Sequence, residues 1–205
     1  MPMGYNVAFD IAGCPLAPGQ TTTQDISALL GKTYISFDHT SGHNKGLPRV
    51  YKVCKNSSTI ALEGRKLVRF STTVTTHPFG CIVNGYVRIH TDDVAGMVDP
   101  DLGASGSVPV DSYFLLQTAG PALGQTPATD SVAGPVDFAV GAKVSAATAA
   151  ASTQTTDAGC VATRNATLGA TGTEVAAWIE NAIGRCASVK ATTNTSEAIL
   201  IMLGD

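Results

Sequence analysis

The sequence predicts a mainly β fold, with a compact barrel-like or sandwich-like domain that follows an extended N-terminal arm. Charged residues make up only 14% of the 205-residue chain, well below the roughly 25% typical of globular proteins. Small and β-branched residues fill the gap, and together with 21 glycines they suit short strands joined by turns. Apolar and polar residues also alternate in many short segments. We therefore divide the chain into an arm over residues 1–22 and a β-rich domain over residues 23–205.

The first elements are the arm, a short link and a strand. Prolines and glycines interrupt any regular element before residue 20. "DISALLGK" (25–32) predicts one helical turn or a short extended link. "TYISFDH" (33–39) alternates, with Tyr34 and Ser36 on one face and Ile35 and Phe37 on the other, which predicts a strand.

Several strands are expected in the middle of the chain. Val and Thr favour a pleated surface at "RVYKVCK" (49–55), "STIALEG" (58–64) and "KLVRFSTTVTT" (66–76). "FGCIV" and "YVRIH" flank Asn84 and Gly85, a dipeptide typical of a tight hairpin turn because both residues accept a positive φ. A further strand is expected from Ser112 to Gln117. The following "GPALGQTPATDSVAGPVD" (120–137) contains too much Gly and Pro for regular structure.

The C-terminal part offers two strands, one ambiguous segment and a hairpin. "AKVSAATAA" (142–150) and "GCVATRNAT" (159–167) contain enough Val and Thr for strands. Residues 174–184 place Val175, Trp178 and Ile179 on one helical face, but we favour strands there because the long-range pattern is β. The last segment, from Asn181 to Leu203, predicts two extended runs around a Thr/Asn/Ser-rich turn.

Charge is distributed unevenly along the chain. Seven basic residues and one acid, Glu63, lie between His43 and Arg69, which gives this segment a net charge of +6. The half from Asp101 to Asp205 has a net charge of −5. This asymmetry suits an acidic protein surface or an adjacent copy of the same chain. The segment lacks a nucleic-acid-binding pattern, so we expect no nucleic-acid partner.

The cysteines predict buried free thiols. Cys14, Cys54, Cys81, Cys160 and Cys186 are odd in number and contain no CxxC spacing, which excludes a disulfide framework and a zinc motif. We expect assembly in a reducing host cytoplasm. No secretion signal or membrane-length apolar stretch is visible, so no membrane partner is expected.

No pattern predicts catalysis, a metal or a cofactor. His39 and His43 are four residues apart, but Ser41 and Gly42 between them indicate a loop. Cys81 follows His77, yet nothing supplies an orienting group or an oxyanion hole. The carboxylates near residues 92–101 lack the spacing of a calcium loop. We therefore expect a protein that is not an enzyme.

Three segments resemble the small β-barrel decoration (cement) proteins of tailed-phage capsids. They are "DISALLGKTYISFDHTSG", "HPFGCIVNGYVRIHTDDVAG" and the closing "AIGRCASVKATTNTSEAILIML". Residues 43–69 and 99–137 depart from the family pattern and look like loop insertions.

The resemblance implies a structural virion protein on the outer capsid surface that bridges neighbouring capsid subunits and acts as a homotrimer. Its partners would be the major capsid protein and itself, and residues 199–203 would be core or trimer-contact residues. We expect the basic residues to contact the capsid: Lys45, Arg49, Lys52, Lys55, Arg65, Lys66 and Arg69. The alternatives are another virion subunit (tail tube, minor head or a glycan-binding fibre module) and a small Cys/His hydrolase.

Overall fold

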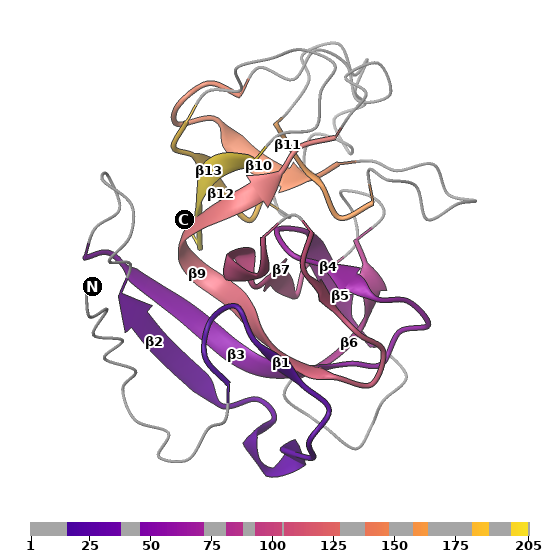
Figure 1. Cartoon of the computed structure of the whole chain (residues 1–205). Helices are drawn as coiled ribbons and strands as arrows, with labels where there is room; N and C mark the ends of the chain where they lie inside the picture. The colour runs from indigo at the N-terminus through magenta and orange to yellow at the C-terminus, as the bar shows by residue number, and fades with distance from the viewer. Residues whose placement is uncertain are drawn as a thin grey trace.

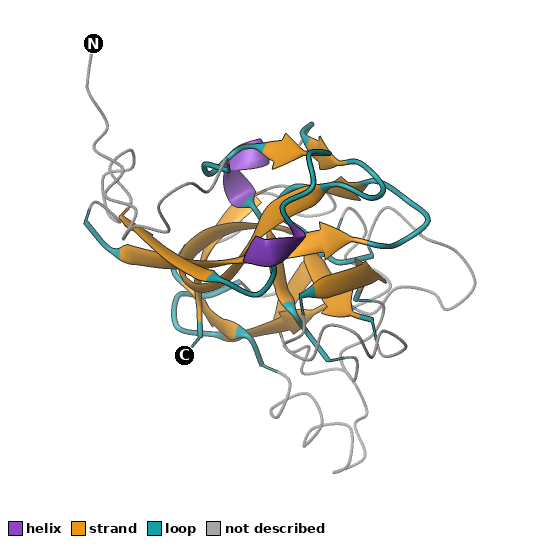
Figure 2. Cartoon of the chain, turned by 90° about the horizontal axis from the view of Figure 1, so that it is seen from below, coloured by secondary structure: helices purple, strands orange, loops and turns teal. Residues whose placement is uncertain are grey.

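Strands dominate the computed structural model of the chain, which describes residues 16–37, 46–71, 81–87, 93–103, 105–127, 138–147, 158–163, 182–188 and 198–204. Two single-turn 3-10 helices are the only helices in these ranges (Figure 2). The N-terminal elements are β1 (Thr21–Thr22), η1 (Ser27–Leu29), β2 (Thr33–Phe37), β3 (Pro48–Asn56), β4 (Leu62–Glu63) and β5 (Leu67–Phe70). The middle of the chain forms β6 (Ile82–Tyr86), β7 (Gly96–Val98), η2 (Pro100–Leu102), β8 (Ser107–Val108) and β9 (Tyr113–Gln125). The last strands are β10 (Lys143–Ala146), β11 (Val161–Thr163), β12 (Gly184–Cys186) and β13 (Ala198–Leu203).

Five strands pair in a closed ring. The order β9-β7-β5-β6-β3 returns to β9 through an additional β3–β9 pairing, and only the β3–β6 pair is parallel. Every strand of the ring contributes to one buried apolar cluster, through Cys54, Val68, Val83, Val98 and Phe114. A closed ring leaves no free edge among its own strands and encloses a packed interior. The prediction of a mainly β barrel-like or sandwich-like domain is confirmed.

A second layer covers the outside of this ring. β13, β12, β10 and β11 extend the sheet from the second half of β9, so β9 runs through both halves of the molecule (Figure 1). Leu67 of β5 and Met97 of β7 point out of the ring and join Val144, Ile199 and Ile201 of the extension in another core. Adjacent residues of these two strands, Leu67 and Val68 of β5 and Met97 and Val98 of β7, are therefore buried on opposite faces.

Gly120 allows β9 to change partners. Residues before it pair with β3, and residues from Gly120 onward pair with β13. Its φ is +89°, and a Cβ there would collide with the carbonyl oxygen of Pro48. Only glycine combines this conformation with so close a backbone approach.

One sequence expectation about the middle of the chain, the tight hairpin turn, is wrong. Asn84 and Gly85 do not form a hairpin turn, because both lie within β6. The register between β5 and β6 shifts there, and Gly85 has a φ of +98°. The dipeptide therefore forms a β-bulge, which uses the same positive φ as a tight turn.

The structure also corrects the loop insertions expected over residues 43–69 and 99–137. The first range contains β3, β4 and β5, and the second contains β8 and β9. Residues 120–125, which we expected to lack regular structure, continue β9 through Pro121. A proline fits there because alternate backbone N–H groups in an antiparallel pair point away from that partner.

Several other expectations are confirmed. The helical turn at η1, the strands β2, β3, β5, β10 and β11, and the pairing of β12 with β13 occur where the sequence predicts them. The end of the predicted arm is tied into the fold, because Leu16 is buried and Thr21 pairs with Phe114 of β9. Most of the ambiguous segment 174–184 and residues 1–15 lie outside the described ranges. Within those ranges, no helix has the length and apolar character to span a membrane.

Candidate contact surface

Six of the seven predicted contact residues lie on β3, on β5 and in the turn between β4 and β5. Arg49, Lys52 and Lys55 are on β3, and Arg69 is on β5. Arg65 and Lys66 precede β5. The remaining residue, Lys45, lies outside the described residues.

Two of these bases are paired with acids from distant parts of the chain. Arg49 Nη1 lies 3.0 Å from one carboxylate oxygen of Asp101 and donates to the other at 3.1 Å. Lys55 Nζ lies 3.2 Å from a carboxylate oxygen of Asp111. Both acids are more exposed than their partners. These pairs reduce the positive charge that β3 presents to a partner.

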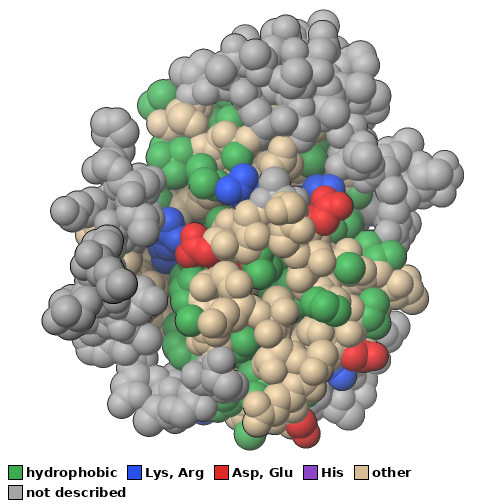
Figure 3. Space-filling view, viewed as in Figure 1, with side chains coloured by type: hydrophobic (Ala, Val, Ile, Leu, Met, Phe, Trp, Pro, Cys, Tyr) green, Lys and Arg blue, Asp and Glu red, His purple; other side chains and the backbone are tan. Residues whose placement is uncertain are grey.

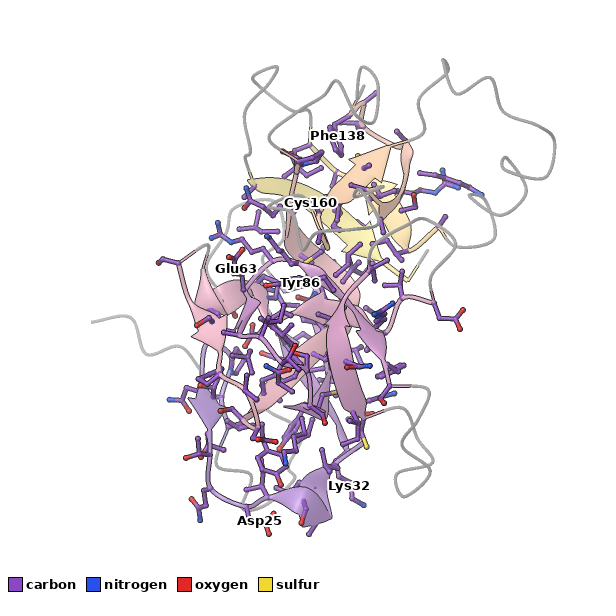
Figure 4. All side chains as sticks on the ribbon, turned by 90° about the vertical axis from the view of Figure 1, so that its right-hand side faces the viewer. Asp25, Lys32, Glu63, Tyr86, Phe138 and Cys160 are labelled. Carbon is purple, nitrogen blue, oxygen red and sulfur yellow. The ribbon has the colours of Figure 1, made fainter. Side chains whose placement is uncertain are left out.

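Lys66 is buried and is a poor contact residue. Its side chain is 8% exposed, and Nζ lies 2.7 Å from a carboxylate oxygen of Glu63. Nζ also lies 5.1 Å from the centroid of the Tyr86 ring, within the range of a cation–π interaction. Tyr86 accepts a hydrogen bond from the Glu63 backbone N–H at 2.7 Å, and Figure 4 shows these two residues side by side. The Lys66 ammonium group therefore contacts groups of its own chain, which makes it less available to a partner.

Lys52 and Arg65 form no ion pair within the described chain. Lys52 Nζ lies 5.5 Å from the centroid of the Phe70 ring. Arg65 adopts a φ of +69°, and its Nε is buried without a hydrogen-bond partner in the described residues. Arg69 lines a small pocket beside β6. Lys52 and Arg65 are thus the described members of the basic segment best suited to meet an acidic partner.

One face of the molecule carries little charge. On the face drawn in Figure 3, charged side chains are sparse, and most blue groups lie next to a red one. Apolar and neutral polar groups cover the rest of the described surface on this face. Such a surface costs little to desolvate when it is buried against another subunit.

The described cysteines are buried, as the sequence predicts. Cys54, Cys81, Cys160 and Cys186 form no disulfide, while Cys14 lies outside the described residues. Burial raises the pKa of Cys54 and Cys81, and it raises the pKa of Cys186 to about 11. A raised pKa lowers the thiolate fraction and therefore the nucleophilicity of each thiol. All four histidines lie outside the described ranges, so the Cys81–His77 pair stays untested.

Among the described residues, Asp99 is the carboxylate with the largest shift of its pKa. Its side chain is fully buried and accepts hydrogen bonds from the backbone N–H groups of Gly19, at 2.6 Å, and Asp101, at 3.0 Å. Burial raises the pKa of Asp99 to about 6, against the opposing effect of these two donors. The contact ties the segment before β1 to the turn after β7. No group of three or more potential metal ligands occurs among the described residues.

The ion pair between Arg49 and Asp101 could not be predicted from the sequence. Arg49 and Asp101 are 52 residues apart, and no local pattern links them. No protein-family model matches the sequence, and no curated protein matches it.

Proposed function

We propose that this chain is a structural virion protein that binds the outer surface of a phage capsid and bridges neighbouring capsid subunits. It acts without catalysis, as a homotrimer, and its partner is the major capsid protein. A protein that binds only the assembled shell stabilises that state by mass action.

The observation that carries this proposal is the C-terminal hairpin. This segment bears the resemblance to cement proteins, and the structure pairs β12 with β13 and then β13 with β9 over six residues. Ile199, Ile201 and Leu203 point into the core, while Leu200 and Met202 are half-buried on the other face. The hairpin therefore lies inside the sheet and not at its edge. This position supports the core or trimer-contact role that the resemblance implies for residues 199–203.

The described thiols weigh against the hydrolase alternative. A nucleophilic cysteine requires a lowered pKa and access to substrate. Cys81 is 2% exposed, and burial raises its pKa. The environment of Cys81 thus opposes the chemistry that this alternative needs.

Lys52 and Arg65 provide the test of the proposed contact. Their reversal to glutamate changes two charges that form no intrachain ion pair in the described chain. Lys143→Glu with Arg185→Glu is the matched control, because these exposed residues are cross-strand neighbours on β10 and β12. Both double variants change the net charge by the same amount.

Each variant is mixed with phage heads assembled without the protein, and the bound fraction is measured after pelleting. We expect Lys52→Glu with Arg65→Glu to reduce head affinity about tenfold, since each lost ionic contact contributes about 0.5–1 kcal/mol. The control pair retains the affinity of the unmodified protein. If both double variants bind heads as tightly as the unmodified protein, the basic segment is not part of the contact with the capsid.

A further inference from the structure

Two buried cysteines lie side by side where the ring closes through its parallel strand pair. Cys54 is part of β3, and Cys81 comes one residue before β6. In this pair Lys55 lies opposite Ile82, and the Lys55 backbone N–H donates to the Cys81 carbonyl oxygen at 2.9 Å. The register therefore places Cys54 next to Cys81, one position before Lys55 and Ile82.

The two side chains point into the same buried space. Residues at paired positions of neighbouring strands project from the same face of a sheet. Cys54 and Cys81 both belong to the apolar cluster inside the ring, together with Phe114, which pairs with Cys54 from β9. Cys54 is fully buried, and Cys81 is 2% exposed. Burial is the main cause of the raised pKa of Cys54, and electrostatic repulsion from Cys81 adds to it, so the two sulfur atoms are near enough to interact.

The backbone spacing suits a disulfide between the two residues. Neighbouring strands lie about 4.8 Å apart, and the Cα atoms of bridged cysteines are about 4.4–6.8 Å apart. Cys81 precedes β6, so the adjustment that brings the sulfur atoms into bonding distance falls outside the regular strand. Cys160 and Cys186 belong to other buried clusters. Among the described cysteines, Cys54 and Cys81 are therefore the pair that the fold brings together.

We propose that Cys54 and Cys81 are a disulfide-forming pair, which a small-molecule disulfide such as oxidised glutathione converts into a covalent bridge between β3 and β6. The thiolate of one cysteine attacks the small disulfide, whose S–S bond breaks and releases one thiolate. The other cysteine then attacks the mixed disulfide, forms the protein S–S bond and releases the second thiolate. The protein loses two electrons and two protons, and the small disulfide becomes two thiols.

Burial determines when this exchange takes place. It is the main cause of the raised pKa of both thiols, and the attacking species in the exchange is the thiolate. The exchange therefore occurs while the pairing of β3 with β6 is open, during folding or in a local opening of the folded chain. Once the pairing closes, the bridge is shielded from solvent.

The bridge stabilises a short pairing in the ring. β3 and β6 pair at two register positions, whereas β3 and β9 pair at six. The bridge also closes the chain between Cys54 and Cys81 into a loop, which reduces the freedom of the unfolded chain. We therefore expect the bridged protein to unfold at a higher urea concentration than the reduced protein.

This inference goes beyond the proposed function and does not depend on it. A reducing cytoplasm keeps the two thiols, and an oxidising medium favours the bridge. A virion protein meets both surroundings in turn, first in the host and then after release.

The direct test is refolding of the reduced, full-length protein from urea in buffers that contain reduced and oxidised glutathione at varied ratios. Free thiols are then alkylated, and mass spectrometry identifies the bridged peptides. We expect one bridge per chain, between the peptides of Cys54 and Cys81. At the same glutathione ratio, the ratio of bridged to reduced chain should be at least about tenfold higher in the folded protein than in urea, because the fold brings the two thiols together.

Two variants complete the test. Cys81→Ala should abolish both the bridge and the shift in urea unfolding. Cys186→Ala, which removes a similarly buried thiol from another cluster, should keep both.

The outcomes separate the possibilities. Free thiols at Cys54 and Cys81 in the folded protein at every glutathione ratio would overturn the inference, and so would an equal bridged fraction in urea. A bridge that joins either residue to a different cysteine would overturn it as well. Bridge formation by a protein that ignores phage heads supports the cysteine pair and contradicts the capsid as partner.

Discussion

Asp99 gives the protein a pH-dependent stability with an unusual sign. The pKa of its buried carboxyl group is about 6 in the folded protein, against an ordinary value of 3.8. Arg49, Asp101 and Tyr51 are the charged and titratable groups that interact with it. Because the folded state holds the proton to a higher pH than the unfolded chain, stability falls as the pH rises from about 4 through about 6.

The size of this effect follows from the shift. A difference of about two pKa units, at 1.36 kcal/mol per unit, corresponds to about 3 kcal/mol. The free energy of unfolding should therefore be about 3 kcal/mol lower at pH 7.5 than near pH 4 as far as Asp99 alone is concerned. Other carboxylates superimpose their own pH dependence, so the measurement must compare variants.

The Asp99→Asn variant isolates the contribution of Asp99 ionisation to the pH dependence of stability. The amide cannot ionise, but it has one acceptor oxygen for the two N–H donors of Gly19 and Asp101. The loss of one hydrogen bond lowers the free energy of unfolding of the variant by about 1 kcal/mol. At pH 7.5 we expect the variant to be about 2 kcal/mol more stable than the unmodified protein, and near pH 4 about 1 kcal/mol less stable. The two stability curves therefore cross.

Urea unfolding followed by circular dichroism between about pH 4 and pH 7.5 measures this crossing. Asp111→Asn is the matched control, because Asp111 is exposed and asparagine tolerates its φ of +61°. The control should keep the pH dependence of the unmodified protein. A constant difference between Asp99→Asn and the unmodified protein at every pH would refute the reasoning.

Three further predictions concern the core, the ion pair of the buried Lys66, and the thiols. Ile201→Ala should lower the free energy of unfolding by about 2–5 kcal/mol, and Leu200→Ala by less than half as much, because Ile201 is fully buried and Leu200 is not; urea unfolding at neutral pH compares them. Lys66→Glu should destabilise the protein by about 2 kcal/mol, because it puts a second carboxylate beside Glu63, whereas Lys66→Met should stay within about 1 kcal/mol; a smaller loss for glutamate than for methionine would contradict the placement of the Lys66 ammonium beside Glu63. Cys54 should react with a thiol reagent only after unfolding, since burial removes both access and thiolate; mass spectrometry of the folded protein after labelling checks this.

The sequence predicted the strands better than the faces they bury. The alternation over residues 33–37 matches β2, because period 2 is a local property of an extended chain. Its buried face holds Tyr34 and Ser36, while Ile35 is 38% exposed. Which face is covered depends on the cluster formed with Tyr51 and Val53 of β3, and no local pattern contains that information.

The positive φ at Gly85 could be predicted, but the kind of structure that contains it could not. A tight turn and a bulge both require it, and the choice depends on where β5 lies, which is a long-range contact. The strand β9 was likewise expected to end at Gln117. It continues because β13, more than 70 residues further along the chain, pairs with its second half.

The charge of the β3 surface could not be predicted either, because it also depends on contacts between distant parts of the chain. A net charge of +6 over residues 43–69 suggests a strongly basic surface, but Asp101 and Asp111 approach from elsewhere and compensate Arg49 and Lys55. Lys66 turns inward toward Glu63. Lys52 and Arg65 remain as candidate contact residues, because they form no ion pair within the described chain.

The most direct test of the proposed function is the binding of the purified protein to phage heads assembled without it. Light scattering first gives the mass of the free protein, and sedimentation of mixtures over a range of protein concentrations then gives the number of copies bound per head. We expect a trimer that binds to saturation at a copy number matching a set of symmetry-related positions and that raises the temperature at which heads release DNA. A monomer that stays in the supernatant at every concentration, or heads whose stability does not change at saturation, would contradict the account.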